Sequence, residues 1–129
     1  MARTAVVPRA LVANGNLNGA TGATTIDSTL VTNGVVVENA KPELMLIRVT
    51  NTEGSTNTVT VRAGDNPPAL AAGLGDLVVT VAATTGVQYI GPFESGRFLQ
   101  GGADAGDLHI DFETGMTGAI DILTFPRNT

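Results

Sequence analysis

The residues with the clearest capacity for chemistry surround His109, the single histidine of the chain. Alternate residues of an extended strand point to one face, so His109 would share a face with three acids, Asp107, Asp111 and Glu113. An imidazole flanked by carboxylates can bind a metal ion or be oriented for proton transfer. The same pattern is typical of an ordinary strand with one solvated polar face, and we expect this second arrangement.

Other catalytic and cofactor-binding signatures do not match the sequence. Ser95 follows Gly91, Pro92, Phe93 and Glu94, so it lacks the first glycine of a Gly-x-Ser-x-Gly nucleophile motif. The glycine- and aspartate-rich residues 101–107 fit neither a calcium-binding nonapeptide repeat nor an EF-hand loop. Cysteine is absent, which excludes disulfides, thiolate catalysis and zinc–thiolate sites. We therefore expect a protein that is not an enzyme and has no metal and no cofactor.

The composition of the chain limits the classes of molecule that it is expected to bind. The net charge of −5 is opposite to that expected of a non-specific nucleic-acid binder. Four phenylalanines, one tyrosine and no tryptophan leave few rings on which sugars or single-stranded nucleic acid could stack. The apolar residues 5–7 are followed at once by Pro8 and Arg9, and no apolar run approaches the ~20 residues that span a bilayer. We expect synthesis in the cytoplasm, with no membrane and no nucleic-acid partner.

Apolar and polar residues alternate with a period of two along most of the chain, which predicts β-strands. We expect eight or nine short strands in an all-β fold, an antiparallel β-sandwich of jelly-roll type. Asn33-Gly34 is a strong hairpin signal that predicts paired strands at 29–32 and 35–38. The remaining strands are expected at residues 43–51, 58–63, 76–82, 86–90, 97–100, 107–113 and 119–125, with a hairpin loop at 114–118.

The N-terminal residues differ from this pattern. Residues 2–12 contain Arg3 and Arg9 but no acid, and the first acid of the chain is Asp27. The run of Asn-Gly and Thr-Gly pairs that follows is too rich in turn residues for a regular element. We interpret residues 1–24 as an extended N-terminal arm and residues 25–129 as the β-sandwich domain. An ordinary first strand followed by a loose loop is the alternative.

Three segments together resemble a known family. They are ELMLIRV at 43–49, NTVTVRAG at 57–64, and GPFESGRF at 91–98 leading to the strand at 107–112. This pattern is similar to that of small head proteins of tailed double-stranded DNA bacteriophages, and most of all to their capsid decoration, or cement, proteins. The resemblance covers nearly the whole chain and consists of strand-and-turn pattern and composition.

The resemblance implies a structural virion protein on the outer capsid surface. Such a protein would form a homotrimer and stabilise the lattice by bridging subunits of the major capsid protein. An extended arm commonly makes these contacts, which would assign them to residues 1–24. Met116, at the expected tip of the last hairpin, is either a further apolar contact or an incidental loop methionine. The candidate partner-binding residues are Arg3, Val6, Val7, Arg9, Leu11 and Met116.

Two other functions predict different sites. A virion adhesin or carbohydrate-binding module, of the head-fibre or tail-tip type, would present clustered aromatic rings around a groove. A small β-fold enzyme that used Asp107, His109 and Asp111 would hold the histidine in a cleft with a perturbed pKa. The structural function predicts a protruding arm, a flat apolar interface and few pockets.

Overall fold

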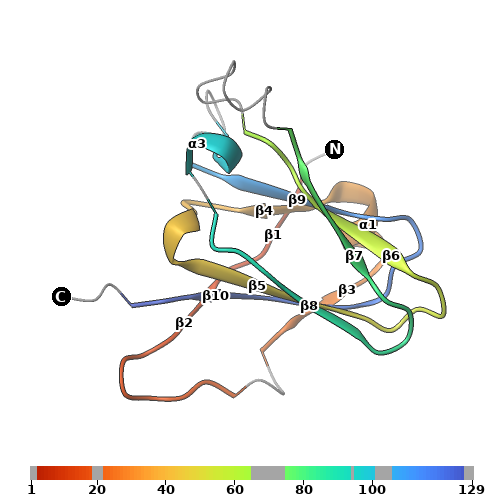
Figure 1. Cartoon of the computed structure of the whole chain (residues 1–129), viewed down its shortest axis with the longest axis horizontal. Helices are drawn as coiled ribbons and strands as arrows, with labels where there is room; N and C mark the ends of the chain where they lie inside the picture. The colour runs from red at the N-terminus through yellow and green to blue at the C-terminus, as the bar shows by residue number, and fades with distance from the viewer. Residues whose placement is uncertain (1–2, 19–21, 65–74, 94, 101–105, 127–129) are drawn as a thin grey trace.

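The computed structural model describes residues 3–18, 22–64, 75–93, 95–100 and 106–126. Two five-stranded sheets pack face to face (Figure 1). Sheet A runs in the order β1 (Thr4–Ala5), β4 (Val35–Val37), β9 (Leu108–Phe112), β6 (Asn57–Val61) and β7 (Leu77–Val81). Sheet B runs in the order β2 (Arg9–Ala10), β10 (Gly118–Thr124), β5 (Met45–Asn51) and β8 (Gly86–Ile90), and β3 (Thr24–Ile26) also pairs with β10.

Eight of these strands have jelly-roll order. When β1 and β2 are left out, the strand orders of the two sheets are β4-β9-β6-β7 and β3-β10-β5-β8. Every neighbouring pair of these strands is antiparallel. Successive strands alternate between the sheets except at β6 and β7, as two interleaved Greek keys require. The predicted all-β sandwich of jelly-roll type is therefore confirmed. The sheets are mixed because β1 and β2 join β4 and β10 in parallel.

The core lies between the sheets and follows from the period of two. Along β5 and β6 every second residue is buried, and the residues between them are half-exposed. Burying an aliphatic side chain contributes roughly 1.5–3 kcal/mol, so this alternation fixes which face of each strand turns inward. The fully buried core residues include Val35, Val37, Met45, Ile47, Val49, Val59, Val61, Leu108, Ile110 and Ile120.

The expected hairpin at Asn33-Gly34 is wrong. Residues Ser28–Asn33 form the short helix α1, in which the Asp27 carboxylate accepts a hydrogen bond from the Leu30 amide at 3.0 Å. Gly34 ends the helix with φ of +79°, and its amide donates to the Leu30 carbonyl. An N-cap acid and a C-terminal glycine with positive φ are helix signals as well as turn signals. Here β4 pairs with β1 and β9, so no strand at 29–32 is needed.

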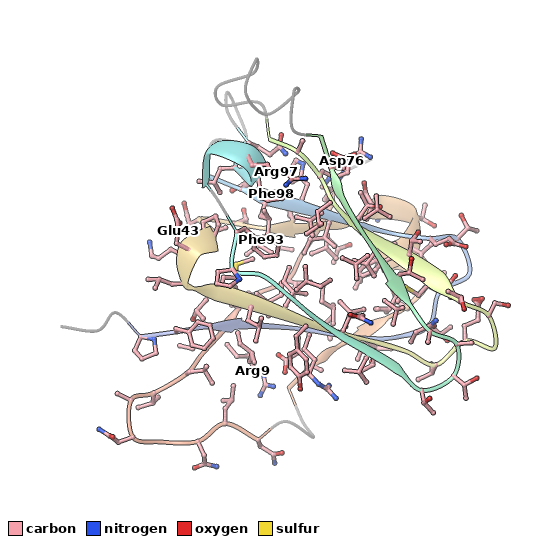
Figure 2. The ribbon with its side chains drawn as sticks, in the orientation of Figure 1. Arg9, Glu43, Asp76, Phe93, Arg97 and Phe98 are labelled. Atoms are coloured by element: carbon pink, nitrogen blue, oxygen red, sulfur yellow. The ribbon has the colours of Figure 1, made fainter. Side chains whose placement is uncertain are left out.

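The strand expected at 97–100 is also wrong, because Ser95–Phe98 forms the short helix α3. Packing explains the difference. The Phe98 ring lies edge-on to the Phe93 ring, with centroids 5.3 Å apart, and both side chains are buried (Figure 2). Arg97 covers the outer face of the Phe98 ring at 4.8 Å from its centroid. Burial of two aromatic rings exceeds the weak β-preference of a four-residue segment. A 3₁₀ turn, η1 (Pro42–Leu44), precedes β5.

The first described residues cross from one sheet to the other. The amides of Thr4 and Val6 donate to the carbonyls of Gly34 and Val36 in sheet A, and the amide of Leu11 donates to Thr124 in sheet B. Between these anchors the Val6 side chain is 5% exposed and belongs to the core. We call residues 3–11 the N-terminal strap.

The strap differs from the expected projecting arm of residues 1–24. Residues 3–11 are part of the sandwich, and a loop at 12–18 leaves it. The boundary drawn between residues 24 and 25 falls within β3, and β2 and β3 both pair with β10. The physical reason is that β4 and β10 would otherwise present unpaired backbone groups along this side, and the strap supplies partners for them.

Substitution of two adjacent valines tests whether the strap is buried in the sandwich. We expect Val6→Ala to lower the free energy of unfolding by roughly 1–3 kcal/mol, because it leaves a cavity between the sheets. Val7→Ala removes the same methyl groups from a side chain that is 81% exposed and should change stability by no more than about 0.5 kcal/mol. Urea unfolding followed by circular dichroism measures both. Equal effects of the two substitutions would contradict burial of the strap.

Candidate binding groove on sheet B

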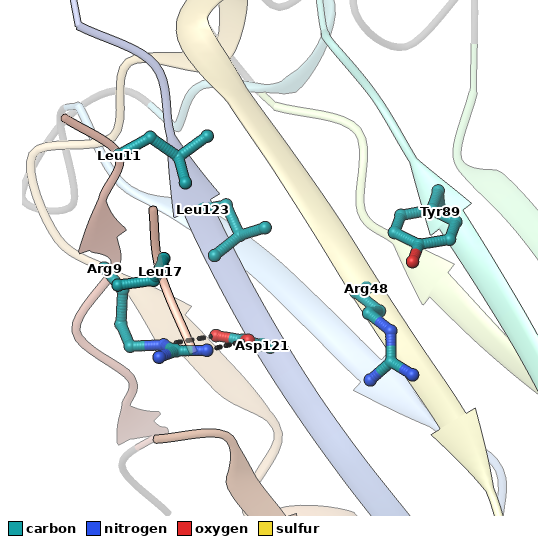
Figure 3. Close-up of a pocket in the computed structure, with 7 residues that line it drawn as sticks. All are labelled: Arg9, Leu11, Leu17, Arg48, Tyr89, Asp121 and Leu123. Atoms are coloured by element: carbon teal, nitrogen blue, oxygen red, sulfur yellow. Dashed lines mark hydrogen bonds and ion pairs between the residues drawn. The ribbon is translucent and has the colours of Figure 1, made fainter. Parts of the chain in front are cut away.

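The outer face of sheet B carries a groove of about 500 Å³. One wall comes from the strap and the loop that follows it, and the floor and opposite wall come from three strands of the sheet (Figure 3). Such a volume is within the usual range for ligand sites in proteins. The residues that line it are Arg9, Leu11, Leu17, Arg48, Tyr89, Asp121 and Leu123.

Strand register brings the polar residues of the groove into one row. Asp121 on β10 is directly opposite Arg48 on β5, and Arg48 is directly opposite Tyr89 on β8. Side chains opposite one another in neighbouring antiparallel strands have β-carbons about 4.5–5.5 Å apart. All three lie on the outer face, because the side chains of Ile47, Val49, Ile90, Ile120 and Ile122 next to them in sequence are buried in the core. The row therefore crosses the face of sheet B at right angles to its strands.

Arg9 and Asp121 form the strongest interaction of the groove. Arg9 Nε donates to Asp121 Oδ1 at 2.9 Å, and Arg9 Nη2 donates to Asp121 Oδ2. The Asp121 side chain is only 5% exposed although it lies on the outer face. These hydrogen bonds, together with the attraction of the two charges, raise the pKa of Arg9 above its ordinary value against the effect of desolvation. The pair holds both charges in place next to the apolar floor.

The same arginine fixes the loop that forms the groove wall. Arg9 Nη1 donates to the carbonyl of Asn18 at 3.1 Å. The chain then returns past the guanidinium at Gly22, where φ is +90° and a β-carbon would lie 2.5 Å from Arg9 Nη1. Glycine favours this conformation, and a side chain here would displace the Arg9 guanidinium. Arg9 thus joins the loop, β2 and β10 at one point, and Leu17 lines the groove as a result.

Arg48 differs from Arg9 in having no acid of its own. Both oxygens of the nearby Asp121 carboxylate already accept hydrogen bonds from Arg9. Within the described parts of the chain, the Arg48 guanidinium has no hydrogen-bond or ion-pair partner. With two arginines and one aspartate, the lining of the groove has a net charge of +1 in a protein of net charge −5.

Four of the six candidate partner-binding residues are engaged within the chain. Arg3 pairs with Asp111 at 2.7 Å and donates to the carbonyl of Ile110, and Arg9 is held as described. Val6 is buried, and Met116, at 2% exposure, lies in the core rather than on the surface. Met116 is a loop methionine between β9 and β10, as the alternative expected, and its burial leaves it no surface for the contact that was the first expectation.

The other two candidates present surface to solvent. Val7 is 81% exposed at the point where the strap passes from sheet A to sheet B. Leu11 is half-buried and lines the groove. The row of Asp121, Arg48 and Tyr89 was not among the predicted sites. Arg48, an arginine between the apolar residues Ile47 and Val49 of a predicted strand, is the one sequence signal that points to it.

The acids expected to share a face with His109 make structural contacts. Asp111 pairs with Arg3 and, at 3.4 Å, with Arg62. Glu113 Oε1 accepts hydrogen bonds from the amide and hydroxyl of Thr58. Among the residues with described positions, no three His, Asp or Glu side chains are grouped closely enough to hold a metal ion.

The Arg9–Asp121 pair can be tested by proteolysis. We expect Asp121→Asn to accelerate tryptic cleavage after Arg9 several-fold, because the strap and loop lose the charge that holds them on β10. Cleavage after Arg62 in the same digest reports global unfolding and should change far less. Asp76→Asn, which removes a partner of the half-exposed Arg62, is the control and should leave cleavage after Arg9 unchanged. Equal rates after Arg9 in wild type and Asp121→Asn would contradict the role of the pair.

Comparison with protein families, with curated proteins and with solved structures found no match in any of the three. No helix in the described part of the chain is long and apolar enough to cross a membrane.

Proposed function

We propose that this chain is a structural virion protein that binds the outer surface of a phage capsid and stabilises its lattice. Its partners in this proposal are the major capsid protein and further copies of the chain, in a homotrimer. The resemblance of residues 43–49, 57–64 and 91–98 to capsid decoration proteins supports it. The jelly roll is compatible, because viral capsid domains use it, but the fold alone hosts many functions.

The observation that carries the proposal is a pair of unprotected sheet edges. β7 ends sheet A and β8 ends sheet B, and these consecutive strands lie next to each other (Figure 1). Neither strand contains a charge or a proline, and in the described residues no further strand pairs with either. Val78, Val87 and Tyr89 are exposed on these two strands, at 59%, 41% and 62%.

Isolated soluble proteins usually protect such edges. Short strands, charged residues, proline or a covering segment prevent an edge from pairing with another chain. The opposite side of this sandwich follows that rule, since its edges are the two- and three-residue strands β1, β2 and β3. An uncharged five-residue edge with exposed apolar side chains is instead typical of a surface that another protein covers.

An adhesin or carbohydrate-binding function has less support. Sugar-binding grooves commonly present several aromatic rings, whereas Tyr89 is the single aromatic residue among those that line the groove on sheet B. A jelly roll is also used by lectin domains, so the fold does not separate the two functions.

Binding to capsids tests the proposal. Purified protein is co-sedimented with expanded capsid shells assembled without it, and we expect saturable, stoichiometric binding. Val78→Lys places a charge on the exposed edge and should weaken binding at least about tenfold, which corresponds to roughly 1.4 kcal/mol. Val12→Lys introduces the same charge at a valine that is 68% exposed in the loop, away from the edge, and is the matched control.

Two results would count against the proposal. If the wild-type protein does not bind shells in a saturable manner, the structural function is wrong, and a glycan array becomes the next measurement. If Val78→Lys and Val12→Lys bind equally well, the edges of β7 and β8 are not the covered surface.

A further inference from the structure

We propose that the groove on sheet B binds a carboxylate that is flanked by aliphatic side chains, in an extended segment of a partner protein, with Arg48 as the recognising residue. The inference rests on the proposed function in taking that partner to be a protein of the capsid shell.

The net positive charge of the groove favours an anionic ligand. Arg48 is half-buried, and within the described structure no acid neutralises it. A guanidinium presents parallel N–H donors that match the two oxygens of a carboxylate. The protein as a whole is acidic, so an acidic partner would be repelled by most of its surface. Arg48 thus marks a place where a carboxylate is attracted.

The contact of Arg9 with Asp121 leaves the Arg48 guanidinium able to bind an anion. Asp121 is directly opposite Arg48 in the register of β10 and β5 and would be its natural partner. The bidentate contact from Arg9 occupies both Asp121 oxygens and neutralises the carboxylate (Figure 3). An incoming carboxylate therefore meets one free cation beside a neutral pair, rather than a salt bridge that it would have to break.

The other residues that line the groove favour aliphatic side chains on either side of the bound carboxylate. Leu11, Leu17 and Leu123 line the side of the groove next to the strap, and Tyr89 forms the opposite wall from β8. The face between β2 and β8 is three strand spacings wide, about 14 Å, which equals roughly four extended residues. A short segment with the pattern apolar–acidic–apolar would place its carboxylate on Arg48 and its side chains on the leucines and the tyrosine ring.

Two peptides that differ in one group test the inference. The probes are acetyl-Leu-Glu-Leu-amide and acetyl-Leu-Gln-Leu-amide, titrated into ¹⁵N-labelled full-length protein and followed by amide and Arg Nε–H shifts. We expect saturable shifts on β5, β8 and β10 with the glutamate peptide, and affinity at least about tenfold lower for the glutamine peptide. The preference should be lost in Arg48→Gln and partly retained in Arg48→Lys, which keeps the charge but not the paired donors.

A second arginine of the chain provides the matched control for this experiment. Arg62→Gln alters an arginine on sheet A that already contacts Asp76 and Asp111, and it should bind both peptides as the wild type does. Equal affinity for the two peptides, shifts outside the groove, or equivalent shifts with inorganic phosphate would overturn the inference.

Shell binding distinguishes failure of this inference from failure of the proposed function. If wild type and Arg48→Gln bind capsid shells equally well, the structural function stands and the role of Arg48 is wrong. If the protein prefers the glutamate peptide but does not bind shells, the groove chemistry stands and the partner is not the capsid. Weakened shell binding by Arg48→Gln, with Arg62→Gln unaffected, is the result that we expect.

Discussion

The passage of the strap from sheet A to sheet B is the constraint on which the rest of this structure depends. Val6 occupies the core between two hydrogen-bonded anchors, and an arginine on each side of it pairs with an acid of a different sheet, Arg3 with Asp111 and Arg9 with Asp121. These contacts supply main-chain partners to β4 and β10 and so close one side of the sandwich. They also fix the direction in which the loop leaves, and that direction creates the groove.

The two sides of the sandwich are consequently unequal. On the strap side the sheets end in short strands, whereas on the other side no further strand of the described residues pairs with β7 or β8. Behind these edges, hydrogen bonds of a buried side chain connect the loops between the strands. The buried Asn51 side chain donates to the carbonyls of Ser55, Val81 and Ala82 and accepts from the Glu53 amide, which joins the β5–β6 connection to the β7–β8 turn. The open side is thus a rigid surface, suited to contact without rearrangement.

Much of the fold could be predicted from sequence because burial imposes a period of two on each strand. The strand at Gly86–Ile90 has the expected bounds, and β5, β6, β7, β9 and β10 agree within two residues. The helices α1 and α3 were missed because Asn33-Gly34 is compatible with a hairpin and with a helix end, and because Phe98 is fixed by contact with Phe93. The groove could not be predicted, since Arg9 and Asp121 are 112 positions apart and only the parallel pairing of β2 with β10 brings them together.

The pairing of β2 with β10 also determines when the molecule can form. Arg9 of β2 and Asp121 of β10 are 112 positions apart, and strands β3 to β9 lie between them in the sequence. Strand β10 is also the neighbour of β3 and β5, so sheet B has no continuous centre until β10 has been synthesised. Contacts between such distant segments slow folding, because the chain must close large loops before it gains their stabilisation. The apolar strands that are synthesised first therefore lack their partners in sheet B until β10 has been synthesised.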